Sequence, residues 1–444
     1  MADAPHDHPV HGDQRAVTTP TRAFRLRLWL ASALWVPVLA GNLLVVIAAL
    51  ALPELDEQFD LADSFPLTVG STQAIFGALA GSMITFTGIV FSAIFIAAQI
   101  QTSAYSPRLA AQLRKDPVIM AALVLSTTTA AYSLFALAAI DQLAVGDENH
   151  VPALTVLFGL ILAIATLAQF AALVQRAFES IQIGGILRTL GKQAWIVIND
   201  VHPPLESAMT LSRPVPPSDV SVAEIEFPGR PGVIAAIDRK AVLKLAAQTG
   251  GFIEVLPQVG QFISERNGAV RIYDGERDAS AKQVRQVFVL SRQRTTDQDP
   301  SFVLRILVDI GIRALSAAIN DPTTAVQVID RIESLLILLY ERHPGPAYVV
   351  DSAGRPKGLV HAPSWIEYFE LGSTELRIYG GQSLQVHRRT RAMHEHLLEV
   401  VSGKDRERVE LELELLDRQM KSSLVSEHDI QLAREGDRLG IGSV

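Results

Sequence analysis

The sequence predicts a membrane α-helical protein, with four transmembrane helices followed by a cytoplasmic α+β region. Apolar residues make up 49% of the 444-residue chain and charged residues only 19%. The charges are scarce between residues 28 and 174 and dense afterwards. Within the charge-poor part lie four uncharged apolar runs, each with about the 20 residues that cross a bilayer core. Only helices satisfy their own backbone in lipid at this length.

The four runs are Leu28–Leu52, Gln73–Gln101, Val118–Ile140 and Pro152–Val174. The first follows a basic segment, as the core of a signal peptide does. It is too long for such a core and lacks a small-residue cleavage site, so we interpret it as a retained span. Asn42 in its middle is expected to hydrogen-bond to a neighbouring helix.

The charges beside the runs predict the orientation of the chain. The linkers 53–70 and 141–151 contain no Lys or Arg and carry Glu54, Asp56, Glu57, Asp60, Asp63, Asp141, Asp147 and Glu148. The opposite flanks carry Arg22, Arg25, Arg27, Arg108, Arg114, Lys115, Arg176, Arg188 and Lys192. By the positive-inside rule, both termini are cytoplasmic and the acidic linkers face outward.

The second run combines its apolar character with a stripe of small and polar residues. At roughly 100° per residue, the stripe lies within about 80° of the helix circumference. Its members are Gly77, Gly81, Thr85, Gly88, Ser92 and Gln99. Tight packing between helices explains such a stripe, because small residues let backbones approach. A pore lining around the axis of a homo-oligomer also explains it. The sequence leaves both interpretations open and favours packing.

The pattern changes after the fourth run. That helix is expected to continue as an amphipathic segment to about Asp200, with a possible bend at Gly184–Gly185. Short β-like runs separated by Gly and Pro, with a helical insert over 239–248, then predict a small β-barrel or sandwich. The predicted organisation is a disordered cytoplasmic tail (1–24), a transmembrane domain with its helical extension (25–200), a small β domain (222–275) and a mainly helical cytoplasmic domain (280–444).

Two Asp-Pro steps predict helix starts in the last domain. Asp299 and Asp321 suit the N-cap position, and the proline that follows each suits the first helical position. The expected helices are 300–319, 322–341, 364–371, 382–401, 404–421 and 426–435, with a turn or short strand near 355–361. The run VELELELLD, residues 409–417, is interpreted as the solvated face of one of them.

No enzyme motif is found, so the protein is predicted not to be an enzyme and to need no cofactor. Cysteine is absent and the net charge is −8, which gives no support to thiolate chemistry or to nucleic-acid binding. His394 and His396 are two residues apart and would point away from each other on a helix. No ionisable residue lies within the spans, which disfavours ion-coupled transport.

A second group of polar residues gathers around the Asp-Pro steps. It comprises Arg294, Asp297, Asp299, Arg305, Asp309, Arg313, Asn320 and Asp321. Buried ion pairs at a helix junction or subunit interface are the favoured interpretation, because both steps already explain two of the acids as caps. A polar ligand pocket, or a divalent cation held by Asp297 and Asp299, is the alternative.

Two long blocks carry a resemblance to a known family. GSMITFTGIVFSAIFIAAQIQTSAYSPRL in the second run and QRTTDQDPSFVLRILVDIGIRALSAAINDPTTAVQVIDRI downstream resemble the signature blocks of domain-of-unknown-function family 2254. The stretch PGVIAAIDRKAVLKLAAQTGGFIEVLPQVGQFI resembles the middle segment of that family. The resemblance covers roughly residues 25–435. It implies a bacterial inner-membrane protein with four spans and a cytoplasmic domain, and no established activity.

Two functional hypotheses follow from the sequence. The first is an oligomeric, channel-like protein in the lipid bilayer, with the second transmembrane helix lining the path. The alternative is a non-conducting membrane scaffold or sensor whose cytoplasmic domain binds a partner or ligand.

Overall fold

A computed structural model describes residues 35–59, 68–109, 116–144, 151–202, 220–423 and 426–435. The predicted tail, residues 1–24, lies outside these ranges. The chain divides into two compact units. The sheet unit contains the described residues of 193–303 and 335–370, and the helical unit contains those of 24–192, 304–334 and 371–444.

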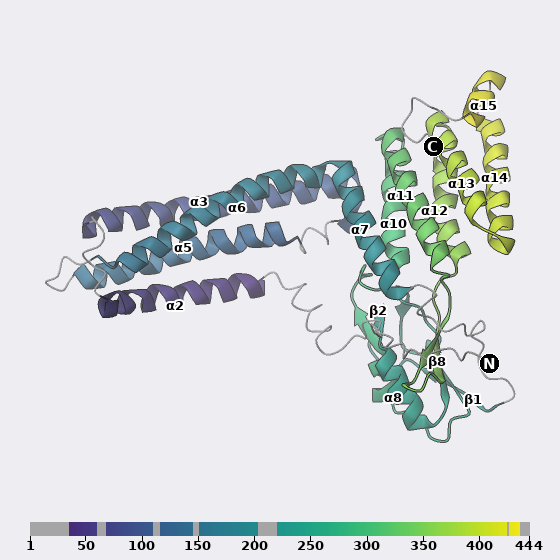
Figure 1. Cartoon of the computed structure of the whole chain (residues 1–444), viewed down its shortest axis with the longest axis horizontal. Coiled ribbons are helices and arrows are strands. Elements are labelled where there is room, and N and C mark those ends of the chain that lie inside the picture. The colour runs from purple at the N-terminus through teal and green to yellow at the C-terminus, as the bar shows by residue number, and fades with distance from the viewer. Residues whose placement is uncertain are drawn as a thin grey trace, which may run out of the picture. The chain divides into compact units, whose positions relative to one another are not determined.

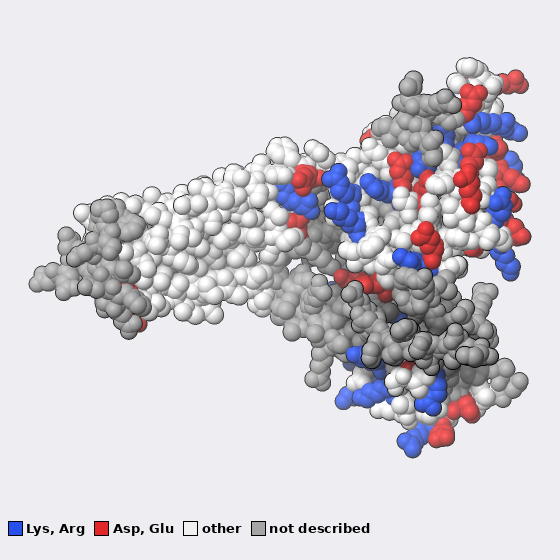
Figure 2. Space-filling view, in the orientation of Figure 1, with Lys and Arg blue, Asp and Glu red and all other residues white. Residues whose placement is uncertain are grey.

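Four apolar helices form the N-terminal part of the helical unit. They are α2 (Trp35–Phe59), α3 (Val69–Ala104), α5 (Pro117–Ala144) and α6 (Ala153–Ile181), and a short 3-10 helix, η2 (Pro107–Leu109), follows α3. All four are long and apolar enough to cross a membrane. They run side by side, with α5 in contact with each of the others (Figure 1). Figure 2 shows almost no charged atoms along them on the face in view. The four predicted spans are therefore confirmed as apolar helices.

Helix α5 carries much of the polar packing of these four helices. Thr129 and Thr166 place their hydroxyl oxygens 2.8 Å apart, which joins α5 to α6. The hydroxyl of Tyr132 donates to the carbonyl oxygen of Thr155 at 2.8 Å. Asn42 Nδ2 donates to Thr127 Oγ1 at 3.4 Å, so its predicted bond to a neighbouring helix is confirmed. Interhelical hydroxyl bonds of this kind satisfy polar groups that lipid cannot solvate.

The predicted helical continuation is present and is interrupted once. Helix α6 ends at Ile181, and α7 (Ile183–Val201) follows after Gln182, whose backbone is extended. A Cβ atom on Gly185 would lie 2.4 Å from the carbonyl oxygen of Glu179. Only glycine allows the backbone to approach so closely at this break. A break is thus present close to the expected bend, but it lies at Gln182, two residues before the glycine pair.

The strands of the sheet unit form two sheets. The first has five strands in the order β1-β5-β3-β8-β7, and the second has three in the order β4-β2-β6. The strands are β1 (Val222–Glu226), β2 (Gly232–Ile237), β3 (Phe252–Val255), β4 (Phe262–Ile263), β5 (Gly268–Tyr273), β6 (Phe288–Ser291), β7 (Ala347–Val350) and β8 (Pro356–Val360). Helices α8 (Arg239–Thr249) and α9 (Ala281–Val287) also belong to this unit. Both sheets and both helices contribute buried apolar side chains to one core.

The predicted small barrel or sandwich is not confirmed. Strand β8 pairs in parallel with β3, with Glu254 opposite Leu359. The larger sheet therefore takes two strands from residues 347–360, beyond the predicted β domain of 222–275. Parallel strands need a long connection between them, so sequence periodicity cannot reveal which strands pair.

The remaining helices are α10 (Pro300–Ala314), α11 (Pro322–Glu341), α12 (Trp365–Tyr379), α13 (Leu384–Val400), α14 (Gly403–Ser423) and α15 (Glu427–Arg434). Both Asp-Pro starts are confirmed. Asp299 Oδ1 accepts from the backbone N–H of Phe302, and Asp321 Oδ1 from that of Thr324, each at 3.0 Å. Helix α10 ends earlier than the predicted residue 319, and Asn320 has a left-handed φ of 48°.

The interpretation of VELELELLD as a solvated face is wrong for one glutamate. The residue Glu412 is only 1% exposed. Its carboxylate accepts hydrogen bonds from Arg377 Nε at 2.8 Å and Arg408 Nη2 at 3.1 Å. Because Val409, Glu412 and Leu416 follow helical spacing, Glu412 lies on the buried face of α14. An arginine from another helix makes its burial possible.

Candidate functional site

Helix α3 has a buried face and an exposed face. Phe76, Ala80, Met83, Val90 and Ala97 are buried, and they pack toward the other apolar helices. All six residues of the predicted stripe lie on the opposite side of the helix and are exposed. They are Gly77, Gly81, Thr85, Gly88, Ser92 and Gln99. We call these six residues the α3 stripe. The structure thus places the predicted residues together on one outer surface of the chain.

The glycines of the α3 stripe do not pack against the chain itself. A Cβ atom on Gly77, Gly81 or Gly88 would meet no described atom within 4 Å. The contrast is with Gly41 and Gly159, where a Cβ would lie 2.8 Å from Thr128 and 2.5 Å from Phe76. Close helix approach within the chain therefore uses Gly41 and Gly159. Helix packing inside one chain does not explain the α3 stripe.

The hydroxyls of the stripe are satisfied within their own helix. Thr85 Oγ1 donates to the carbonyl oxygen of Gly81 at 3.1 Å, and Ser92 Oγ to that of Gly88 at 2.9 Å. Such bonds to the preceding turn leave the hydroxyl oxygens free to accept. The side chain of Gln99 makes no hydrogen bond to another described residue. The stripe is consequently an uncharged surface whose polar groups can make further hydrogen bonds.

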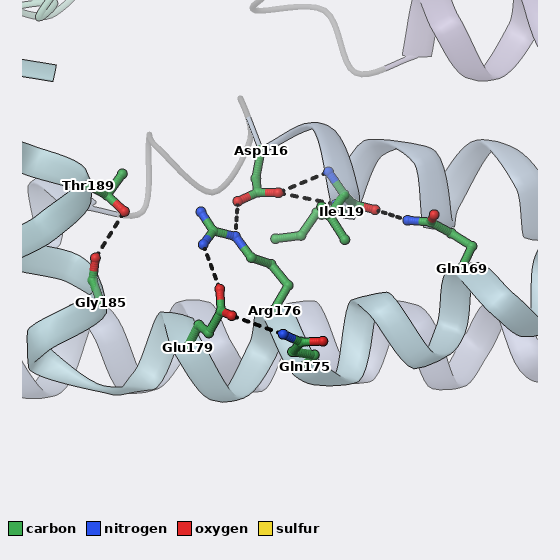
Figure 3. Close-up of polar contacts among 9 residues, drawn as sticks. Asp116, Ile119, Gln169, Gln175, Arg176, Glu179, Gly185 and Thr189 are labelled. Carbon is green, nitrogen blue, oxygen red and sulfur yellow. Dashed lines mark hydrogen bonds and ion pairs between the residues drawn. The ribbon is translucent and has the colours of Figure 1, made fainter. Parts of the chain in front are cut away.

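Polar contacts between α5 and α6 lie at one end of the apolar helices (Figure 3). Asp116 Oδ2 accepts from Arg176 Nε at 2.7 Å, and Asp116 Oδ1 accepts from the backbone N–H of Val118 at 3.0 Å. Gln169 Nε2 donates to the carbonyl oxygen of Val118 at 2.8 Å. Asp116 thus caps α5 and binds α6 at the same time. The sequence placed Arg176 in a basic flank but did not predict this ion pair.

A second carboxylate binds a helix start in the same set of helices. Asp56 near the end of α2 is only 1% exposed. Its oxygens accept from the backbone N–H groups of Ala153 at 2.8 Å and Leu154 at 3.2 Å, at the start of α6. The sequence placed Asp56 in an acidic linker that faces outward and did not predict this contact. The carboxylate replaces water at the helix N-terminus.

The predicted polar cluster divides between the two units. In the sheet unit, Arg294 binds both carboxylate oxygens of Asp299, at 2.9 Å each. In the helical unit, Arg305 Nε donates to Asp309 Oδ1 at 2.9 Å and Nη2 to Glu375 Oε2 at 2.9 Å. Asp297 falls in the sheet unit, and Arg313, Asn320 and Asp321 fall in the helical unit. The contacts of Arg294, Asp299, Arg305, Asp309 and Asp321 are ion pairs and helix caps, and Glu375 is a partner that sequence reasoning missed.

The two neighbouring histidines of α13 bond to different helices. His394 Nε2 lies 2.7 Å from the hydroxyl of Ser373 on α12, whereas His396 Nδ1 contacts the carboxylate of Glu333 on α11. The prediction that they point apart is confirmed. Among the described residues, no group of three or more His, Asp or Glu is placed to hold a metal ion.

Comparison with known proteins gives one family and several relatives. The family model "Predicted membrane protein (DUF2254)" matches residues 31–396. An uncharacterized protein of Mycobacterium tuberculosis is 28% identical over 333 residues, which cover 72% of this chain and 62% of that relative. An uncharacterized protein of Mycobacterium bovis matches with the same identity and coverage. The chain therefore spans less than two thirds of the length of these curated relatives. No solved structure matches the chain.

The family match and the fold agree. The match extends from the first apolar helix to α13, and the four apolar helices are those expected of a membrane protein. The resemblance seen in the two sequence blocks is thereby confirmed. The chain belongs to DUF2254, a family of predicted membrane proteins.

Proposed function

We propose that the chain forms a homo-oligomer in the bacterial inner membrane, in which the α3 stripes of neighbouring copies face one another and line a channel-like path. The supporting observation is that the stripe is exposed along the apolar helix and that a Cβ atom added to any of its glycines would meet no neighbouring described atom within 4 Å. Both termini are cytoplasmic in this proposal, in line with the charges beside the spans. The proposal assigns no catalytic chemistry to the chain.

A second copy suits the α3 stripe better than lipid does. A surface that only faces lipid gains from large apolar side chains, which Ile89 and Ile96 supply beside the stripe. Glycines instead let a second helix approach closely, and this is how many transmembrane helices associate. Uncharged hydroxyl and amide groups also suit a conduction path, because they replace part of the hydration of a solute without binding it tightly.

Purified full-length protein in liposomes tests this proposal. We expect flux of small solutes across liposomes that contain the protein, and a particle mass in detergent of several chains. Ser92→Leu adds bulk to the centre of the stripe and should reduce flux and weaken assembly.

Ser82→Leu is the matched control. Ser82 is also an exposed serine of α3, but it lies about 100° from the centre of the stripe at 100° per residue. The control should behave like the wild type. A monomer in both detergent and bilayer would overturn the proposal, as would equal effects of the two substitutions. An oligomer that shows no flux would support the interface between α3 stripes but would contradict the conduction path.

A second candidate function is a non-conducting membrane sensor whose C-terminal region binds a small ligand. The observation that favours it is a cavity in the sheet unit that contains a mostly buried arginine.

A further inference from the structure

The sheet unit contains a cavity of about 80 Å³. It lies at the C-terminal end of α7 and at the starts of α8 and α10, and all its lining residues belong to the sheet unit. Much of its wall is apolar, with Val201, Ile237, Val259, Val360 and Pro363 among the lining residues. A mainly apolar cavity with a few polar groups is typical of a small-molecule site.

One cation lines this cavity without an anionic partner among the described residues. Arg239 is the first residue of α8 and is mostly buried. Its side chain makes no ion pair or hydrogen bond with the described residues, and burial lowers the pKa of its guanidinium. An arginine stays charged in proteins, so burial without a counter-charge is unfavourable. A bound anion would supply the missing charge.

The nearby carboxylates do not fill this role. Asp299 lines the cavity, but Arg294 binds both its oxygens at 2.9 Å. Asp238 precedes Arg239 in the chain and caps α8, because its Oδ1 accepts from the backbone N–H groups of Lys240 and Ala241 at 3.0 and 3.1 Å. Asp200 also lines the cavity but is exposed, so water solvates it.

Two neutral polar side chains also line the cavity. His202 Nε2 lies 3.3 Å from the hydroxyl of Tyr368, and both side chains are buried. Burial, followed by the positive charge of Arg239, lowers the pKa of His202 to about 4. The imidazole is therefore neutral at pH 7 and offers hydrogen bonds without a second positive charge. Nearby, His361 Nε2 lies 2.8 Å from Glu254 Oε1, so this nitrogen already has a hydrogen-bond partner.

We propose that this cavity binds a small molecule that carries an oxyanion, either a carboxylate or a phosphate, on a small apolar portion. The oxyanion would pair with Arg239, whose fork of N–H donors matches both groups. The apolar walls would cover the rest of the molecule. This inference deepens the second candidate function and does not depend on assembly through the α3 stripe.

Thermal unfolding of the full-length protein in detergent tests the proposal with three probes. Benzoate is the carboxylate probe, benzamide is its neutral counterpart of similar shape, and inorganic phosphate is the phosphate probe. We expect benzoate, phosphate or both to raise the unfolding midpoint, and benzamide to have no effect. A shift with benzoate alone identifies a carboxylate ligand, and one with phosphate alone identifies a phosphate ligand.

Arg239→Gln supplies the decisive comparison. It should weaken binding of the active probe by about tenfold or more, because a charge-assisted bond is lost. In buffer without the probes its midpoint should equal or exceed that of the wild type, since an unpaired buried charge has been removed. Lys240→Gln, at the exposed neighbouring residue, should bind like the wild type.

Three results would overturn the inference. The first is a wild-type midpoint that no anion changes at millimolar concentration. The second is an equal response of Arg239→Gln and the wild type, which would indicate a general salt effect. The third is a lowered midpoint of Arg239→Gln in buffer without the probes, which would show that a carboxylate of the chain already pairs with Arg239. None of these results concerns solute flux. If the proposed oxyanion site is contradicted, the proposed conduction path is still tested separately by the liposome experiment.

Discussion

His394 is a titratable residue whose environment changes strongly on folding. It is fully buried on α13, with its Nε2 against the hydroxyl of Ser373. Burial, and then the positive charges of Arg377 and Arg391, lower the pKa of His394 from 6.5 to about 3. Its neighbour His396 contacts Glu333 and is partly exposed. Two histidines that are two residues apart therefore have different surroundings, because only His394 is fully buried.

The buried imidazole predicts a loss of stability in acid. Between pH 6.5 and about 3 the unfolded chain binds a proton at His394 that the folded chain does not. The contribution of His394 is complete above pH 6.5 and falls by about 1.4 kcal/mol for each unit of decreasing pH. His394→Asn should reduce the slope of unfolding free energy against pH by about one proton. Denaturant titrations between pH 5 and 7 measure this slope.

A control histidine lies on the surface of the same unit. His428 on α15 is exposed, so His428→Asn should leave the slope of unfolding free energy unchanged. An unchanged slope in His394→Asn would contradict the assignment of the proton to this residue.

At the scale of elements, the break between α6 and α7 depends on one close approach. A Cβ atom on residue 185 would lie only 2.4 Å from the carbonyl oxygen of Glu179. A Cβ added to Gly184 beside it would meet no neighbouring described atom within 4 Å. The two adjacent glycines therefore have different roles, although the sequence presents them as an equivalent pair.

This difference gives a matched pair of substitutions. Gly185→Ala should destabilise the protein by about 1–3 kcal/mol, because the backbone must shift to admit the methyl group. Gly184→Ala should be neutral or slightly stabilising, since alanine favours a helix over glycine. Thermal unfolding in detergent measures both effects. Equal effects of the two substitutions would show that the break does not depend on the contact with Glu179.

At the scale of the whole molecule, charge separates the chain into an apolar part and a charged part. The four apolar helices carry few charges, whereas the helices from α10 onward carry many. The proposed orientation places the second part in the cytoplasm, with the acidic linkers outside.

Cysteine labelling tests this orientation directly, because the natural chain contains no cysteine. Glu54→Cys, near the outer end of α2, should react with a membrane-impermeant maleimide in intact cells. Lys404→Cys, at the exposed start of α14, should react only after the membrane is permeabilised. The reverse pattern would show that the termini face outward, and the cysteine-free parent reports background labelling.

The sequence by itself determined the four apolar helices, both Asp-Pro helix starts and the bounds of α11. These features depend on the length of an apolar run, on its period and on residues within one helical turn, and all of these are local. The positions of the α3 stripe on one helix face follow from the same periodicity. Local pattern therefore predicted which residues of the candidate site share a surface.

Only the tertiary structure decided what those residues contact. It showed that the α3 stripe is exposed whereas Gly41 and Gly159 are packed. It also paired β8 with β3 and buried Glu412 against Arg377. Each of these outcomes depends on a partner distant in the sequence, and a helical or strand period specifies the face of an element but not what covers it. For the same reason, the unpaired position of Arg239 became visible only when the surrounding carboxylates were found with other partners.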